Sequence, residues 1–219
     1  MSKKIIITVD GPAGSGKSTV AKHIAKKLNM KFLSSGKIYR TFAYLETQYG
    51  YDEAQKLIKE IKINEGNIIF RNQNLDSIIS SEKMGQKASE LSRKKEVREI
   101  VNRIQRDVVY GTPEDFVVEG RDEGTEVFPE ADLKIFLDAS PEERAKRKYL
   151  EQKEKDINYF IQKIKERDNM DSTREISPLK VPEGAIVIDT TSKTVEEVVQ
   201  EIIKEIKKIP DLSIKIQQV

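Results

Sequence analysis

Residues 9 to 28 read VDGPAGSGKSTVAKHIAKKL, and this stretch decides the fold. The apolar run KIIITV at residues 4 to 9 predicts a buried strand, and the residues after position 17 predict a helix. Between them, Gly11 to Ser18 match the pattern G-x-x-x-x-G-K-[ST]. Glycines let successive backbone N–H groups of such a turn point inward at the start of a helix, where they bind a phosphate anion. The stretch therefore predicts a strand, a phosphate-binding loop and a helix.

The side chains of this loop indicate a nucleoside triphosphate with Mg²⁺. Lys17 is expected to reach the β- and γ-phosphates, and the hydroxyl of Ser18 is expected to ligate Mg²⁺. The residues predicted to contact the donor phosphates are Gly11, Gly14, Ser15, Gly16, Lys17, Ser18 and Thr19. The loop specifies the donor in this way and leaves the acceptor open.

The composition is that of one globular, charge-rich domain. The 219 residues are 37% hydrophobic and 35% charged, which suffices for one sizeable core with a small insert. A net charge of +2 gives no indication of a nucleic-acid partner. The absence of cysteine excludes disulfides and thiolate chemistry, and the single histidine, His23, argues against a histidine metal site. With no apolar run of membrane-spanning or signal-peptide length, we expect a cytoplasmic protein without membrane contact. We also expect it to act as a monomer.

Alternating strands and helices predict the fold class. The runs DFVVEG (115–120), LKIFLD (133–138) and AIVID (185–189) predict further buried parallel strands, separated by helical stretches. The expected architecture is a three-layer α/β/α fold with a parallel central sheet. Helix starts are marked at Ser140-Pro141 and at Thr194, where Glu197 completes a capping box. The apolar stripe expected to pack in the core after Thr194 comprises Val195, Val198, Val199, Ile202, Ile203 and Ile206.

Two segments interrupt the alternation. Residues 62 to 85 contain short apolar runs broken by turn residues, which predicts a small antiparallel meander between helices. Residues 142 to 169 are dominated by charge, and composition alone indicates an exposed, solvated helical pair. In a small-molecule kinase, such an insert would hold the acceptor and such a pair would close as a lid. A GTPase is disfavoured because no Asn-Lys-x-Asp segment is present.

Three further segments carry candidate acceptor residues, two of them at the carboxyl ends of predicted strands, where ligands bind in parallel sheets. The segment FLSSGKIYR (32–40) offers Arg40 as a phosphate ligand, and VVEGRDEGTEVFP (117–129) places Arg121 beside Asp122. Guanidinium and ammonium groups stabilise the charge on the peripheral oxygens of a phosphoryl group in transfer. The charged helical pair and the residues directly after it contribute such groups in Arg144, Arg147, Lys148, Arg167 and Arg174.

The segments DGPAGSGKST, SSGKIYR, ASELSRKKEVR, EGRDEGTEVFP, LDASPEERAKRK and IKERDNMDSTR occur in this order. In order and spacing, from about residue 5 to 206, the chain resembles the bacterial cytidylate (CMP) kinases, nucleoside monophosphate kinases of the P-loop NTPase class. The resemblance implies Mg²⁺-dependent, in-line phosphorylation of CMP, and of dCMP, by ATP in pyrimidine nucleotide metabolism. It also implies one kinase domain over residues 1–219: a core (about 1–40, 90–140 and 176–219), an acceptor-binding region with a small β insert (about 41–89) and a lid (about 141–175).

The resemblance also implies roles for individual residues. Those implied around the cytosine are Ser35, Arg98, Asp122 and Arg174; around the ribose, Ser89, Arg167 and Asp171; and at the acceptor phosphate, Arg40 and Arg121. Those implied in catalysis are Lys17, Arg121 and Arg167, with Arg144 and Arg147 in the lid and residues 189–194 on the adenine side. Four positions depart from the usual pattern of the family: Ser34 and Glu119 (usually Asp), Glu123 (commonly apolar) and Met170 (often basic). The segment between Arg40 and Ser89 is shorter than in many bacterial members.

Other functions stay open at this point. A different small acceptor, such as UMP, a deoxynucleotide or an alcohol, is compatible with the loop. Ser35 and Asp122 favour a base with an amino group, as in cytosine, over uracil, which presents a carbonyl there. A non-enzymatic nucleotide sensor or RNA-binding module would use the basic helix after residue 143, but Glu143 and Glu151 interleave with its cations and aromatic residues are few.

Overall fold

The structure is a computed structural model that describes residues 3–152 and 155–210. Its main sheet is parallel, with strand order β2-β6-β1-β7-β8. The strands are β1 (Ile6–Asp10), β2 (Lys31–Ser34), β6 (Phe116–Gly120), β7 (Leu133–Asp138) and β8 (Ile186–Asp189). The central strands β1 and β6 are buried along their whole length, as expected for strands covered by helices on both faces. The predicted parallel sheet is thus confirmed.

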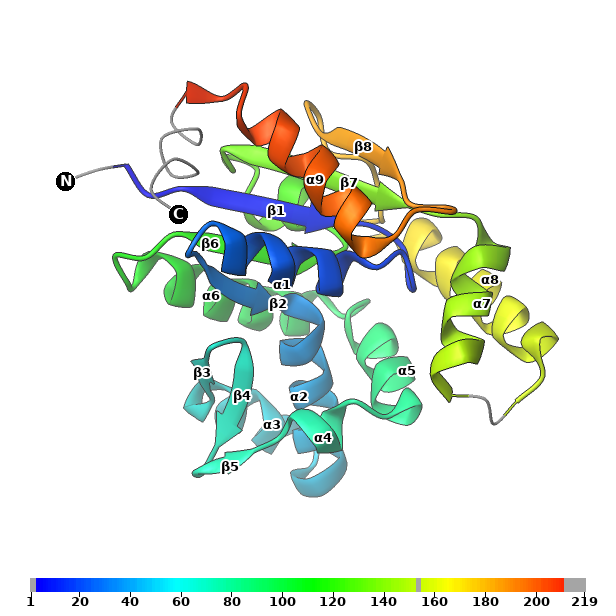
Figure 1. Ribbon diagram of the computed structural model, residues 1–219. Helices are drawn as coiled ribbons and strands as arrows, with labels where there is room; N and C mark the ends of the chain where they lie inside the picture. The colour runs from blue at the N-terminus through cyan, green and yellow to red at the C-terminus, as the bar shows by residue number, and fades with distance from the viewer. Residues whose placement is uncertain (1–2, 153–154, 211–219) are drawn as a thin grey trace.

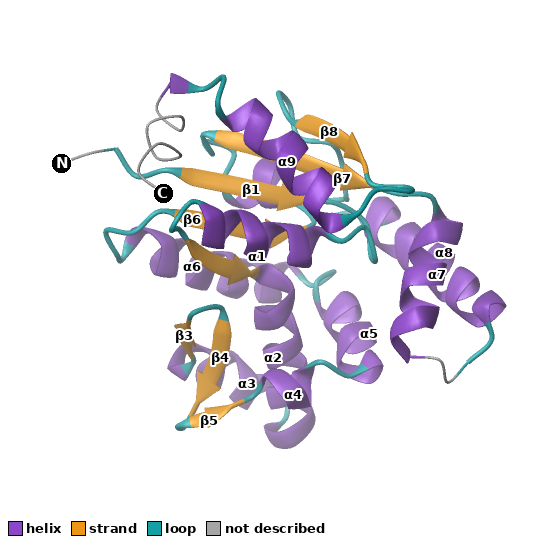
Figure 2. Cartoon of the chain, viewed as in Figure 1, coloured by secondary structure: helices purple, strands orange, loops and turns teal. Residues whose placement is uncertain are grey.

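Helices cover both faces of this sheet (Figures 1 and 2). The helices α1 (Lys17–Lys27) and α9 (Val195–Ile206) pack on one face, where Ile7, Val9 and Ile135 are buried. The helices α2 (Ser35–Tyr49) and α6 (Lys95–Tyr110) pack on the other face. The structure therefore has the three α/β/α layers that the sequence predicts.

The insert after α2 differs in extent from the predicted meander. Following α3 (Tyr51–Leu57) and the 3₁₀ turn η1 (Ile58–Glu60), the antiparallel strands are β3 (Lys62–Asn64), β4 (Asn67–Phe70) and β5 (Gln73–Asn74). The prediction is wrong for residues 75 to 85, which form α4 (Asp76–Ile79) and the start of α5 (Glu82–Leu91). The physical reason lies in two side chains: Asp76 accepts the N–H of Ile68 at 3.0 Å, and Ser81 caps α5 by accepting the N–H of Met84 at 3.3 Å.

The charged segment forms the two helices α7 (Pro141–Gln152) and α8 (Ile157–Thr173), which project beyond the carboxyl end of the sheet (Figure 1). Ser140 caps α7 by accepting the N–H of Glu143 at 3.2 Å, as predicted. The pair is not simply a solvated surface, because Ala145, Phe160 and Ile164 form a small core of their own. Across the described ranges, none of the helices combines the length and the apolar character that a membrane span needs.

The strand register gathers polar side chains at one edge of the sheet. Asp10 lies opposite Gly120, and Ser34 lies opposite Glu119. The chain then leaves β6 in η2 (Glu123–Val127), a π-helical turn, and the carboxylate of Asp10 accepts the N–H groups of Glu123 and Gly124 at 2.9 and 2.8 Å. This edge carries both the phosphate-binding loop after β1 and the Arg121-Asp122 pair after β6.

The capping box that opens α9 is present. The hydroxyl of Thr194 accepts the N–H of Glu197 at 3.3 Å, and the Glu197 carboxylate accepts the N–H of Thr194 at 2.8 Å. Five residues of the predicted stripe are buried: Val198, Val199, Ile202, Ile203 and Ile206. The core prediction is wrong for Val195, which is 37% exposed because it lines a surface pocket beside the phosphate-binding loop.

The cap gives a stability prediction. Thr194→Ala removes the oxygen that satisfies the N–H of Glu197, and we expect the free energy of unfolding to fall by about 1 kcal/mol in urea denaturation. Glu197→Gln is the matched control, because glutamine also completes a capping box and retains most of the stability. An unchanged denaturation midpoint for Thr194→Ala would contradict this account of the start of α9.

Candidate active site

The phosphate-binding loop joins the end of β1 to the start of α1. Gly14 and Gly16 adopt left-handed φ angles of 79° and 86°, which non-glycine residues rarely adopt. A Cβ atom on Gly11 would collide with the carbonyl oxygen of Leu137 in β7, so the loop passes close to the neighbouring strand. The backbone turn predicted from the glycines is therefore present.

Lys17 is turned onto its own loop. Its side chain is buried, and Nζ donates to the carbonyl oxygen of Pro12 at 3.2 Å. Burial, reinforced by the positive charge of Arg121, lowers the pKa of Lys17 to about 7, although Glu119 and Asp171 act in the opposite direction. The ammonium thus lacks a sufficient counterion, and a phosphate anion beside it would favour its charged form.

Two pockets meet at this loop. The larger, of about 610 Å³, lies between the loop, α2, α5, the end of β6 and α8. The smaller, of about 370 Å³, lies between the loop, α7 and the start of α9. The residues that line both pockets are Gly14, Lys17, Ser18 and Lys148. Six of the seven predicted donor residues line the smaller pocket; Gly11 instead lies where the loop approaches β7.

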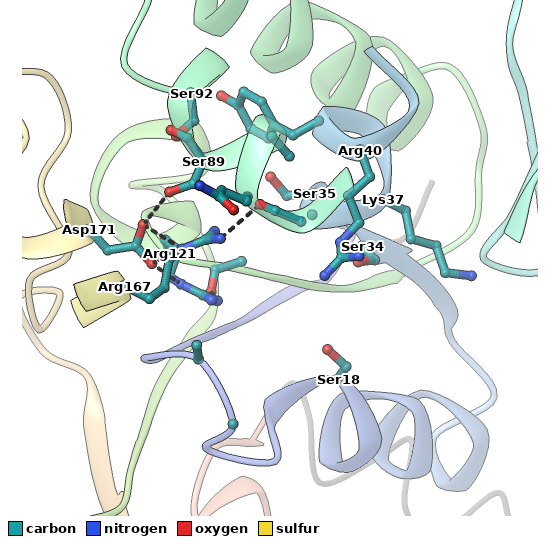
Figure 3. Close-up of a pocket in the computed structure, with 18 of the residues that line it drawn as sticks. Ser18, Ser34, Ser35, Lys37, Arg40, Ser89, Ser92, Arg121, Arg167 and Asp171 are labelled. Atoms are coloured by element: carbon teal, nitrogen blue, oxygen red, sulfur yellow. Dashed lines mark hydrogen bonds and ion pairs between the residues drawn. The ribbon is translucent and has the colours of Figure 1, made fainter. Parts of the chain in front are cut away.

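The larger pocket collects most of the predicted acceptor residues, several of which Figure 3 shows converging on one space. Those that line it are Ser35, Arg40, Ser89, Arg121, Asp122, Arg167, Asp171 and Arg174. Arg98 does not line the pocket and forms a buried ion pair with Asp122. Arg174 donates to the other oxygen of Asp122 at 3.0 Å. The carboxylate of Asp122 is therefore held in position by two guanidinium groups.

Asp171 is the anion to which two predicted catalytic arginines bind (Figure 3). Its carboxylate accepts from Nε of Arg121 at 2.8 Å and from Nε of Arg167 at 3.2 Å, and Ser89 lies 3.5 Å away. Burial acts to raise the pKa of Asp171, but the two arginines outweigh it and bring the pKa to about 2. The Asp171 carboxylate is thus the shared counterion of the Arg121 and Arg167 guanidinium groups.

Arg40 lies on α2 across the pocket from this pair. Its guanidinium donates to the carbonyl oxygens of Ile79 and Ser81, both at 3.0 Å. Burial and the positive charges of Arg167 and Arg121 lower the pKa of Arg40. Backbone carbonyls do not neutralise a cation, so this wall of the pocket holds an excess of positive charge suited to a dianionic phosphate.

The lid cations have different surroundings from one another. Arg144 is buried outside both pocket linings, where it forms an ion pair with Asp168 and donates to the carbonyl oxygen of Ala13 at 3.1 Å. Arg147 lines the smaller pocket and donates to the carbonyl oxygen of Thr190 at 2.6 Å. The expected convergence of the lid arginines on one phosphoryl group is therefore not seen for Arg144.

Lys148 is the lid cation at the junction of the two pockets. It has no hydrogen bond or ion pair to any residue of segments 3–152 and 155–210. Burial lowers its pKa; Arg40 and Arg167 lower it further, while Glu151 and Glu82 raise it. The sequence places Lys148 in the basic cluster but does not distinguish it from the other cations. In a helix with several cations, only the folded structure shows which one lies at the junction of the two pockets.

Three of the four unusual positions lie at the pocket. The hydroxyl of Ser34 donates to the carboxylate of Glu119 at 2.5 Å, so the two form one buried hydrogen-bonded pair across neighbouring strands. Met170 lines the larger pocket on α8. Glu123 is buried behind the pocket wall.

His23 lies exposed on α1, where Nδ1 is 2.8 Å from the carbonyl oxygen of Thr19, which agrees with the predicted surface position.

The residues present fit a magnesium ion that is bound mainly by phosphates. Ser18 exposes its hydroxyl in the first turn of α1 and lines both pockets. Within the described segments there is no group of three or more Asp, Glu, His or Cys residues that could hold a metal ion. Mg²⁺ commonly binds through few protein ligands together with waters and substrate phosphates, and a hydroxyl oxygen is a suitable ligand.

Solved structures share this fold. The shikimate kinase from Acinetobacter baumannii, solved with shikimate, superposes with a TM-score of 0.52 over 94% of this chain and 95% of its own, at 16% identity. An uncharacterized protein from Eubacterium ventriosum superposes with a TM-score of 0.57 over 94% of this chain and 99% of its own, at 17% identity. These similarities confirm the P-loop kinase fold.

Sequence comparison is more specific than the shared fold. The family model for cytidylate kinase matches residues 7–208. A cytidylate kinase from Pseudothermotoga lettingae is 45% identical over 91% of this chain and 92% of its own. A cytidylate kinase from Aquifex aeolicus is 42% identical over 90% of this chain and 94% of its own. This chain belongs to the cytidylate kinase family.

Proposed function

We propose that the protein transfers the γ-phosphoryl group of ATP to CMP and yields ADP and CDP, with dCMP as a further acceptor. Membership of the cytidylate kinase family supports the choice of reaction. The observation that carries the proposal is the meeting of two pockets at Lys17, Ser18 and Lys148. One pocket would hold the triphosphate and the other the monophosphate, so that the reacting groups come together at this junction.

In the smaller pocket the triphosphate would lie along the loop. The backbone N–H groups around Gly14 and Gly16 would cradle the β-phosphate, and Lys17 would leave the Pro12 carbonyl to bind the β- and γ-phosphates. The exposed side chain of Val195 and the turn at residues 189–194 would contact the adenine side. When bound at Ser18, Mg²⁺ would neutralise charge on the phosphate oxygens.

In the larger pocket CMP would be held by charge at one end and by hydrogen bonds at the other. Arg40 and Arg121 would bind the phosphate, while Ser89, Arg167 and Asp171 would approach the ribose. Asp122 and Ser35 would accept hydrogen bonds from the N4 amino group of cytosine. Arg98 and Arg174 would fix the Asp122 carboxylate, which supports discrimination against a base that presents a carbonyl at this place.

The transfer itself needs no general base. The second pKa of a phosphate monoester is about 6, so the acceptor is largely dianionic at neutral pH. An acceptor oxygen would attack the γ-phosphorus while the bond to the β–γ bridging oxygen breaks and ADP leaves. The site would overcome the repulsion between two anions with Lys17, Arg121 and Arg167. Closure of the acceptor-binding region (about 41–89) and the lid (about 141–175, of which 153–154 lie outside the described residues) would exclude water.

Lys17 provides the first test. We expect Lys17→Ala to lower kcat for CMP phosphorylation by about 100-fold or more, because it removes a cation that acts on the transferring group. The measurement is a coupled assay with ATP, Mg²⁺ and CMP. Lys26→Ala, an exposed position on the same helix, is the control and should retain full turnover. Near-normal turnover in Lys17→Ala would rule out the assigned donor site.

Asp122 provides a test of the acceptor base. In Asp122→Asn one acceptor oxygen becomes a donor at similar volume, so we expect the ratio of kcat/KM for CMP over UMP to fall by about tenfold or more. Asp107→Asn, an exposed position on α6, should leave the ratio unchanged. If Asp122→Asn kept the wild-type preference, the base would have to bind elsewhere. Turnover of UMP in preference to CMP by the wild-type protein would instead identify the alternative acceptor.

Lys148 provides a test of the junction. Because its ammonium lies where the two pockets meet, we expect Lys148→Ala to reduce kcat by about 100-fold and to change the two KM values much less. Lys148→Arg should restore part of the turnover. Lys146→Ala removes an exposed lysine two residues earlier on α7 and should have no effect. Equal kcat values for the two alanine variants would place Lys148 outside the transfer step.

A further inference from the structure

Glu123 is a buried carboxyl group that the proposed phosphoryl transfer does not use. It begins η2 directly after the Arg121-Asp122 pair, and its side chain is fully buried. The hydroxyl of Ser35 in α2 lies beside the carboxyl group and acts to lower its pKa, but neither carboxyl oxygen forms a well-aligned hydrogen bond with any residue that the structure describes. Because buried polar atoms are nearly always paired, a carboxyl group with two unpaired oxygens at this place calls for a functional explanation.

The side chain of Glu123 lies directly behind the wall of the larger pocket. A Cβ atom on Gly120 would collide with Oε1 of Glu123, so the carboxyl group packs against the backbone of Gly120. Gly120, Arg121 and Asp122 all line the pocket on the other side. The backbone N–H of Glu123 is bound by Asp10, which holds the turn at the end of the sheet.

The surroundings of this carboxyl group are mostly negative. The titratable and charged groups around it are Asp10 of β1, Glu119 and Asp122 at the end of β6, Tyr39 of α2, Arg98 of α6 and Arg174 after α8. Both arginines are paired with Asp122, and no described residue forms a hydrogen bond with the Tyr39 hydroxyl. Burial, followed by the charges of Asp122 and Asp10, raises the pKa of Glu123 well above its usual value. A neutral carboxylic acid suits this environment.

We propose that Glu123 is a positioning residue for the acceptor: it packs behind Gly120 as the neutral acid, and loss of its proton loosens the turn that carries Arg121 and Asp122. The inference rests on the proposed function for the identity of the acceptor. An ionised Glu123 would repel the carboxylate of Asp10, to which the turn is tied by only two N–H groups. In a buried site such repulsion is poorly screened, so we expect the turn η2 to move away from Asp10.

The inference predicts a specific kinetic signature. Arg121 and Asp122 would bind CMP less well as Glu123 ionises, so the KM for CMP should rise with pH in the wild-type protein. The rise would reach at most about tenfold per pH unit above the pKa of Glu123. Glu123→Gln retains the shape of the side chain and cannot ionise, so its KM for CMP should stay level over the same range.

The experiment is a comparison of KM and kcat for CMP from about pH 6 to about pH 9 in three proteins. Glu126→Gln is the matched control, because it removes a carboxyl group from an exposed position of the same turn. We expect the wild type and Glu126→Gln to share the rise in KM with pH and Glu123→Gln to lack it. Taking the difference between variants cancels the titration of Lys17 and of the acceptor phosphate, which all three proteins share.

Thermal unfolding supplies a readout that does not depend on catalysis. Folded Glu123 keeps a proton that the unfolded chain releases above about pH 4.5, so folding takes up a proton and wild-type stability falls as pH rises. The Tm advantage of Glu123→Gln over the wild type should therefore grow between about pH 5 and pH 8, whereas Glu126→Gln should show no such trend. Glu123→Met, of similar length and without a titrating group, takes the place of Glu123→Gln if the amide variant folds poorly.

The outcomes separate the two proposals. If the wild type phosphorylates CMP and its KM profile coincides with that of Glu123→Gln, the role of Glu123 in acceptor binding is overturned. If Glu123→Gln gains no Tm with pH, Glu123 is not held as the neutral acid. If the wild type does not phosphorylate CMP at any pH, the proposed function fails, whereas the Tm comparison still reports the protonation of Glu123.

Discussion

Repulsion between partly buried cations is the constraint on which the rest of this structure depends. Arg40, Arg121, Arg167 and Lys148 surround one pocket, and Asp171 is the carboxylate that two of them share. Of the other two, Arg40 is bound to backbone carbonyls and Lys148 has no ion pair within the described part of the chain; burial, followed by the charges of the neighbouring cations, lowers the pKa of both. Such an arrangement is costly when empty and becomes favourable when a phosphate enters. The fold must therefore supply enough stability elsewhere to hold these side chains in place.

The parallel sheet supplies that stability and also sets the positions. Hydrophobic cores on both faces bury the strands, and the strand register brings Asp10, Ser34, Glu119 and Gly120 to one edge. Short connections from that edge carry the phosphate-binding loop and η2. The helical pair α7 and α8 then approaches from outside, and Arg144 anchors it to the loop through the carbonyl oxygen of Ala13. Arg40, Arg121 and Arg167 are thus each held by hydrogen bonds to elements around the pocket.

Local signals in the sequence predicted much of this, and the failures have physical causes. The glycine spacing of the loop and the Thr194–Glu197 box were confirmed because their hydrogen bonds form within a few residues. The meander was extended too far because the apolar residues between 75 and 85 have no distinct period, and the hydrogen bond of Asp76 to β4 and the Ser81 cap of α5 are seen only in the folded chain. Val195 has the spacing of a core residue, yet α9 starts at the rim of a pocket. The role of Arg144 was also missed, since its partner Asp168 lies on another helix.

The sequence by itself determined the fold class, the donor loop and the family resemblance, because these depend on contiguous residues and their period. Only the tertiary structure decided which cations meet at the junction and that Arg98 supports Asp122 from outside the pocket. It also decided that Glu123 is buried behind Gly120. These properties arise between residues far apart in the chain. Charge, burial and pKa at such a site depend on the distances between elements, and a linear pattern does not contain those distances.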